Sequence, residues 1–126
     1  MATIKSFTDL SQSKTLSKIL KFESADMYWW YSGKRYYIEA MDDGDFNEEE
    51  GHIRAWSLAA LLEQLKAEIQ LEKKQILFLH INKYNDINYD IRYTNSWTGE
   101  VLIAKADNLV DACVAMIVRL NELNLL

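Results

Sequence analysis

The sequence predicts an α+β fold in one domain covering residues 1–126, and three observations support this prediction. A chain of 126 residues is long enough to bury a hydrophobic core of its own. Apolar residues recur at helical spacing in three segments. Five other segments are rich in aromatic residues or alternate between apolar and polar residues, as β-strands do. The expected order is α-β-β-α-β-β-β-α, in a mainly antiparallel sheet with the two long helices packed on one face.

The first helix is expected over residues 11–20, where Leu16, Ile19 and Leu20 form one apolar stripe. Short polar side chains near its start can accept hydrogen bonds from the first helical N–H groups, so the boundary has several candidates. Ser11 or Ser13 can cap the helix, and Thr8 and Asp9 are competing start signals.

Residues 27–41 predict an aromatic β-hairpin with its turn in residues 32–34. The turn can centre on Ser32-Gly33 or on Gly33-Lys34. Both registers pair an odd residue with an even one, so both produce the same two faces. The more apolar face is assigned to the core, and it comprises Met27, Trp29, Tyr31, Tyr36, Ile38 and Ala40.

The opposite face of this hairpin is the candidate interaction surface. A contiguous apolar patch is costly to leave in water, so something is expected to cover it. Three covers are considered: the first helix or an adjoining strand, a partner chain such as a second copy, and a stacked base or other flat ligand. The residues of this surface are Tyr28, Trp30, Arg35 and Tyr37.

Residues 42–51 (DDGDFNEEEG) predict a mobile acidic loop, because like charges repel and resist compaction. An EF-hand alignment starting at Asp43 puts Glu48 where that motif requires glycine and Arg54 where it requires a bidentate glutamate. No metal site is therefore predicted. Weak adventitious cation binding and mimicry of nucleic acid by the carboxylates are the alternatives for this loop.

Residues 54–71 predict an amphipathic helix, which is the clearest helix of the sequence. Strands are then expected at residues 75–84, 87–94 and 100–105, and the first of them should be central in the sheet because it is apolar on both faces. The apolar stripe of the predicted helix comprises Leu58, Leu61, Leu62, Leu65 and Ile69.

The turn between the first two of these strands is placed at Asn85-Asp86, which would bring His80 opposite Ile91. Leu77, Leu79 and Ile81 would then emerge on the face opposite the core. A last helix is expected to begin at the N-cap residue Asp107 and to run to the end of the sequence.

No catalytic constellation is found among the reactive side chains. His80 is interpreted as a core histidine, and His52 as a solvated side chain of the acidic loop. Cys113 lies on an apolar helical stripe, where a free cysteine behaves as a small hydrophobe. Ser57 lacks the glycine frame of a nucleophile elbow, and no glycine-rich phosphate loop is present. The sequence predicts neither an enzyme nor a cofactor.

Charge and cysteine content restrict the partners and the compartment. The formal net charge is −5, and the densest basic cluster is only Lys73-Lys74, so binding to nucleic acid is disfavoured. The lone cysteine cannot form an internal disulfide. The sequence shows no signal-peptide core and no apolar stretch of membrane-spanning length. A cytoplasmic protein is therefore expected, with no membrane contact.

Three stretches resemble a family of small proteins of gut anaerobes, often encoded in prophages or other mobile elements. They are ESADM at residues 23–27, AWSLAALLEQL at residues 55–65 and ADNLVDACVAMIVRLNELNLL at residues 106–126. The final strand–Ala-Asp–helix unit is also similar to the end of phage α/β/α sandwich domains. Neither resemblance transfers a catalytic residue.

The leading hypothesis is a non-enzymatic protein-binding or regulatory protein of a phage or mobile element. Its partner would be another protein, for which a second copy of the chain is one candidate. The alternatives are a small ligand-binding protein or enzyme with an unfamiliar pocket, and a nucleic-acid binder that uses the aromatic hairpin.

Overall fold

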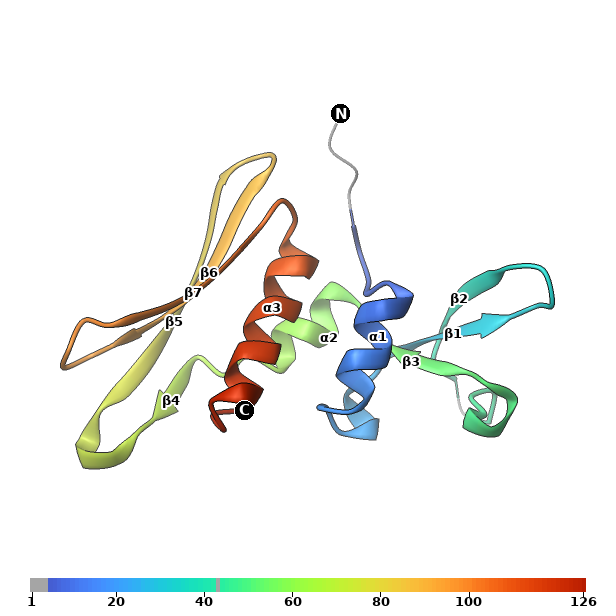
Figure 1. The fold of residues 1–126 in the computed structure, drawn as a ribbon, viewed down its shortest axis with the longest axis horizontal. Coiled ribbons are helices and arrows are strands. Elements are labelled where there is room, and N and C mark those ends of the chain that lie inside the picture. The colour runs from blue at the N-terminus through green and yellow to red at the C-terminus, as the bar shows by residue number, and fades with distance from the viewer. Residues whose placement is uncertain (1–4, 43) are drawn as a thin grey trace.

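Three helices lie between two antiparallel sheets in the computed structural model, which describes residues 5–42 and 44–126 (Figure 1). The α+β class is confirmed, but the expected single sheet is divided into two, with strand orders β2-β1-β3 and β4-β5-β6-β7. No helix in the described part of the chain has the length and apolar content to cross a membrane. The helices are α1 (Leu10–Ser17), α2 (Leu58–Glu63) and α3 (Leu109–Glu122), and the strands are β1 (Met27–Tyr31), β2 (Tyr36–Ala40), β3 (Ile53–Ala55), β4 (Glu68–Gln70), β5 (Ile76–Asn85), β6 (Asn88–Asn95) and β7 (Val101–Ala106).

Helix α1 begins after Asp9, which settles the choice among the N-cap candidates. The Asp9 carboxylate accepts a hydrogen bond from the Gln12 backbone N–H at 2.8 Å, and the Gln12 side-chain oxygen accepts one from the Asp9 N–H at 3.1 Å. This reciprocal capping box satisfies two N–H groups that have no partner within the helix. Leu16, on the predicted apolar stripe, is fully buried.

The β1–β2 hairpin has one of the two predicted registers. Tyr31 lies opposite Tyr36, and the Ser32 N–H donates to the Arg35 carbonyl at 3.0 Å, so the turn centres on Gly33-Lys34. Gly33 has a φ of 95°, a conformation that glycine adopts without steric cost. Strand β3, which the sequence did not predict, pairs with the other edge of β1.

The predicted helix over residues 54–71 is wrong, because only its middle is helical. Ala55 belongs to β3 and pairs with Met27, whereas Ile69 belongs to β4 and pairs with Leu77. Both ends of the segment supply backbone hydrogen bonds to strands that would otherwise lack a partner on that side, and this tertiary pairing outweighs helix propensity. The apolar positions still point inward, since Leu61, Leu65 and Ile69 are all buried.

The register of β5 against β6 differs from the prediction. Asn85 pairs with Asn88, and a bulge lies between Lys83 and Asn85, so the turn occupies residues 86–87. Ile81 therefore lies opposite Ile91, and the face assignment of β5 reverses, because a one-residue slip moves every side chain to the other face. The expectation that Leu77, Leu79 and Ile81 point away from the core is wrong, since Leu77 is buried in it.

Helix α3 begins one residue later than predicted, and it ends at Glu122 rather than at the end of the sequence. The Asn108 side chain, rather than that of Asp107, accepts the capping hydrogen bond, from the Asp111 N–H at 2.8 Å. The Asp111 carboxylate also accepts hydrogen bonds from Lys5 and Gln12, both at 2.8 Å, and these bonds connect the N-terminal segment to α3.

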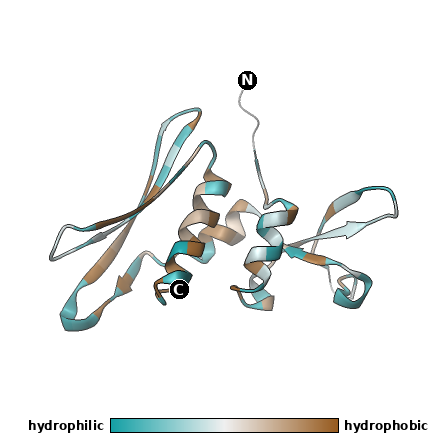
Figure 2. Ribbon diagram, in the orientation of Figure 1, coloured by the Kyte–Doolittle hydropathy of each residue, from teal (hydrophilic) through white to brown (hydrophobic). Residues whose placement is uncertain are grey.

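One hydrophobic core joins the three helices to the inner face of the β4–β7 sheet. Figure 2 shows brown segments along α2, α3 and the strands of this sheet, whereas the β1–β2 hairpin is mostly white to teal. Fully buried residues of this core are Leu16, Trp56, Leu61, Ile91, Tyr93, Val110, Cys113, Met116 and Ile117.

Candidate functional site

The β1–β2 hairpin holds most of the predicted interaction surface. Trp30 and Tyr37 lie on the same face and stack at 5.0 Å between ring centroids. The Arg35 guanidinium lies 4.8 Å from the centre of the Tyr37 ring, and its Nε donates a hydrogen bond to the Tyr37 hydroxyl at 2.7 Å. The structure thus brings Trp30, Arg35 and Tyr37 together as one continuous group, which we call the hairpin surface.

Tyr28 does not belong to the hairpin surface, and its assignment there is corrected. Only 4% of Tyr28 is exposed, because His52 stacks on its ring at 5.1 Å and Phe46 packs against it edge-on. Its hydroxyl donates to Glu39 at 3.0 Å. Burial, together with the hydrogen bond to this carboxylate, raises the pKa of Tyr28 to about 12.

The face assigned to the core is only partly covered. The Trp29 indole N–H donates to the Thr8 carbonyl at 3.1 Å, and the ring packs edge-on against Phe7. Tyr31 is 54% exposed, however, and its ring meets that of Tyr36, which is also exposed. The outer end of the hairpin therefore presents aromatic rings to solvent on both faces.

One polar atom of the hairpin surface is unsatisfied. Among the described residues, the buried Trp30 Nε1 is the only buried side-chain nitrogen or oxygen without a hydrogen-bond partner. Buried indole N–H groups usually find an acceptor, so the unpaired N–H of Trp30 carries a free-energy cost in this structure.

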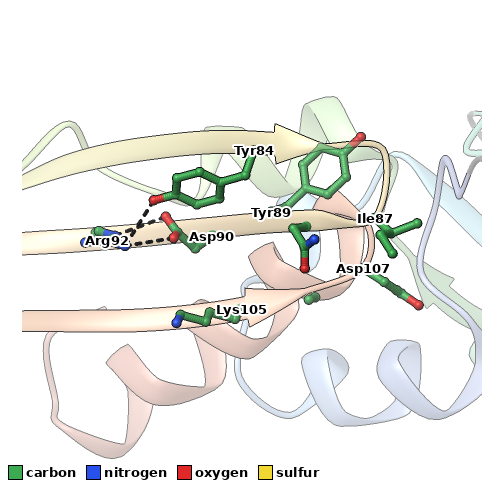
Figure 3. Close-up of a pocket in the computed structure, with 9 residues that line it drawn as sticks. Tyr84, Ile87, Tyr89, Asp90, Arg92, Lys105 and Asp107 are labelled. Carbon is green, nitrogen blue, oxygen red and sulfur yellow. Dashed lines mark hydrogen bonds and ion pairs between the residues drawn. The ribbon is translucent and has the colours of Figure 1, made fainter.

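A second polar group lies on the outer face of the β4–β7 sheet, and sequence reasoning missed it. Asp90 is 1% exposed, yet it lies on the face away from the core. Its carboxylate accepts hydrogen bonds from Arg92 at 3.0 and 3.2 Å and from Asn82 at 2.9 Å, and Arg92 also donates to the Tyr84 hydroxyl at 3.0 Å (Figure 3). The hydrogen bonds from Arg92 lower the pKa of Asp90 to about 2 against the opposing effect of burial. The signal in the sequence was an acid and an arginine two residues apart, on one face of a strand.

A cavity of about 620 Å³ lies beside this group. It is lined by the β5–β6 turn, the beginning of β6 and the end of β7 (Figure 3). The lining includes aromatic, cationic and anionic side chains, namely Tyr84, Tyr89, Asp90, Arg92, Lys105 and Asp107.

The histidines occupy positions that differ from both predictions. His80 pairs with Arg92 on the outer face of the sheet and is exposed, because the shifted turn places it away from the core. His52 is not solvated: its Nδ1 accepts a hydrogen bond from the Asn47 N–H at 3.0 Å, and its ring packs on Tyr28.

The acidic segment has local structure at its end. Residues Glu48–Glu50 form a 3₁₀ turn, for which Asn47 provides the cap, and Phe46 anchors the segment against Phe22 and Tyr28. Asp43 lies outside the described residues. Within the described part of the chain, no three His, Cys, Asp or Glu side chains are grouped so that they could hold a metal ion.

The remaining nucleophile candidates have structural roles. Cys113 is fully buried, and burial raises the pKa of its thiol to about 12, so the reactive thiolate is disfavoured. The Ser57 hydroxyl caps α2 by accepting from the Ala60 N–H at 3.2 Å, and it donates to the Asp26 carboxylate.

Comparison with known proteins yields no relatives: no protein-family model, curated protein or solved structure matches this chain. The functional argument therefore depends on the surfaces described above.

Proposed function

We propose that this chain is a non-enzymatic protein-binding protein that contacts its partner through the hairpin surface. The observation that carries the proposal is the exposure of aromatic rings at the outer end of the β1–β2 hairpin: Tyr37 on the hairpin surface, and Tyr31 and Tyr36 on the opposite face. In the residues that the structure describes, neither α1 nor an adjoining strand covers them. Of the three covers considered for this patch, a partner chain is therefore the one we favour.

The residue types support a protein partner. Tyr, Trp and Arg are enriched where binding energy concentrates at protein interfaces, because they bury a large area with few rotatable bonds. Trp30 and Tyr37 are already stacked, and Arg35 lies over the Tyr37 ring, so little side-chain freedom would be lost on binding.

The resemblance of residues 55–65 and 106–126 to proteins of gut anaerobes suggests the setting. On that basis we propose that the protein acts as a regulatory protein of a phage or mobile element.

The test is affinity capture from the native host with the whole chain, comparing wild type with Trp30→Ala and Tyr37→Ala. Trp97→Ala is the matched control, because Trp97 is 63% exposed in the turn between β6 and β7 of the other sheet and does not line the cavity beside Arg92. We expect one protein to be recovered by wild type and by the control, and a loss of at least about tenfold in affinity for the hairpin variants. Equal recovery by all four proteins would show that the hairpin is not the contact surface.

A second candidate function is the binding of a small ligand in the cavity beside Arg92. The observation that favours it is a volume of about 620 Å³ with two tyrosines and two cationic side chains in its lining. A ligand with an aromatic ring and an anionic group would fit this lining. In a screen of such compounds, binding that Arg92→Met abolishes and Trp30→Ala leaves unchanged would favour this function over the first.

A further inference from the structure

Strand β7 is an edge of the β4–β7 sheet, with one side of its backbone unpaired. The Asn95 N–H donates to the Glu100 carbonyl at 2.8 Å, so every second residue counted from Glu100 forms the backbone hydrogen bonds to β6. Leu102 and Ala104 therefore bond to β6, whereas the backbone groups of alternate residues point outward. In the described part of the chain, no other backbone hydrogen bond reaches these outward residues, which are Val101, Ile103 and Lys105.

The edge formed by β7 has only one of the features that usually protect strand edges, the charge of Lys105. On the opposite edge, β4 has only three residues, and the end of β5 beyond it has a bulge between Lys83 and Asn85. Strand β7 has six residues in register with β6, contains no bulge and carries a single charge, that of Lys105. Val101 and Ile103 also leave 41% and 44% of their surfaces exposed. A regular, apolar edge of this kind is a template for another strand.

We propose that a second copy of this chain pairs antiparallel with β7, so that the two four-stranded sheets form one continuous sheet. A two-fold axis at Ile103 places Ile103 opposite Ile103 of the second copy and Val101 opposite its Lys105. Val101, Ile103 and Lys105 of each copy then direct their N–H and C=O groups toward the other copy, giving about six new hydrogen bonds.

The chemistry of the strand favours a second copy as the occupant of this edge. In the proposed register no like charges face each other, because each Lys105 lies opposite a valine. The two Lys105 residues are separated by four residues along the strand, about 13 Å. The exposed side chain of Ile103 would be covered by Ile103 of the other copy, and that of Val101 by the aliphatic part of its Lys105. Helix α3 packs on β6 and β7 from the opposite face.

The proposed pairing is independent of the hairpin surface. Figure 1 shows the β1–β2 hairpin and the β4–β7 sheet on opposite sides of the three helices. A dimer formed through β7 would therefore carry two hairpin surfaces, both free and far from the dimer interface.

The first test measures the mass of the full chain by light scattering at concentrations up to about 1 mM. Wild type is expected to approach twice the chain mass of 14.7 kDa. Ile103→Lys, which brings two ammonium groups together at the two-fold axis, should weaken self-association at least about tenfold. The matched control is Ile81→Lys, because Ile81 is also 44% exposed but lies on β5, two strands from β7 and in the stretch of β5 that extends beyond β4. A monomeric wild type, or equal association by the two folded variants, overturns the proposal.

The second test measures the register by oxidative cross-linking. Cysteines at position 103 should lie about 5.5 Å apart between Cα atoms, within disulfide range, whereas cysteines at position 101 should be about 13 Å apart. Cys113 is buried and so does not compete. Ile103→Cys should therefore form covalent dimers much faster than Val101→Cys, and the reverse order would disprove the two-fold axis at Ile103.

Trp30→Ala should leave the mass and the cross-linking unchanged. If Trp30→Ala leaves partner capture unchanged, the proposed function fails while the proposed dimer stands. If wild type does not self-associate, the proposed dimer fails while the proposed function stands.

Discussion

The two sheets of this protein use their aromatic and apolar residues differently. In the β4–β7 sheet, the inward residues Ile91 and Tyr93 are fully buried beneath α3. In the β2-β1-β3 sheet, Tyr28 is the one buried residue of the hairpin, and no residue of β2 is buried. The first sheet thus forms part of the core, whereas the hairpin presents large rings to solvent.

This difference indicates where stability and binding reside. Burying a large apolar side chain contributes about 1.5–3 kcal/mol to folding, so residues of the core are constrained by stability. Rings that stay exposed contribute less to folding and remain available for a partner. Substitutions in the hairpin surface should therefore change binding with little effect on the fold, which makes the comparison testable.

The largest expected effect comes from truncating matched isoleucines in the two sheets. Ile91→Ala creates a cavity at a fully buried site and should lower the free energy of unfolding by about 2–5 kcal/mol. Ile38→Ala, at the one half-buried residue of the otherwise exposed β2, should cost less than half as much. Urea denaturation of both variants measures the difference, and equal losses would show that the hairpin belongs to the core as fully as β6 does.

A smaller effect is expected from removing an arginine on each sheet. Arg92→Met leaves the buried Asp90 carboxylate with Asn82 as its main remaining donor and should lower the free energy of unfolding, because a buried acceptor loses its charged donor. Arg35→Met, at the exposed hairpin surface, should change stability by no more than about 0.5 kcal/mol. Thermal and urea unfolding report both values. If Arg92→Met is as mild as Arg35→Met, the polar group on the outer sheet face adds nothing to the fold.

The smallest expected effect is a pH dependence that originates in the β4–β7 sheet. Hydrogen bonds from Arg92 hold the pKa of folded Asp90 at about 2, below the ordinary value of 3.8. Because the folded pKa is depressed, the stabilisation is complete above the ordinary value and is lost as pH falls toward about 2. The stability of wild type relative to Asp90→Asn should therefore decrease over this interval. Asp86→Asn, at a side chain that is 93% exposed, is the control and should parallel wild type.

The sequence predicted most of the elements because their signals are local. Aromatic content located the hairpin, and alternation located β6, each within one or two residues of its observed bounds. Helical spacing located α3, which ends at Glu122 rather than at the end of the sequence. Residues 54–71 were mistaken for one helix, because strands of three residues are too short to show a period. The capping residue Asp9 was among the candidates, but several neighbours carry equivalent acceptors.

For the candidate site, the sequence placed Trp30, Arg35 and Tyr37 on one face, since face parity follows from a turn of known length. It could not predict that Phe46 and His52 would cover Tyr28, because the acidic segment lies far from β1 along the chain. The bulge after Lys83 likewise leaves no local signal, yet it moved His80 to the outer face and left the Asp90–Arg92 pair there.

The sequence by itself determined the α+β class, the aromatic hairpin and the apolar stripe of α3, because these follow from periodicity between near neighbours. Only the tertiary structure decided that the strands divide into two sheets and which rings remain in solvent. Those outcomes depend on contacts between distant segments, where the pairing of backbone groups and the exclusion of water outweigh local preference.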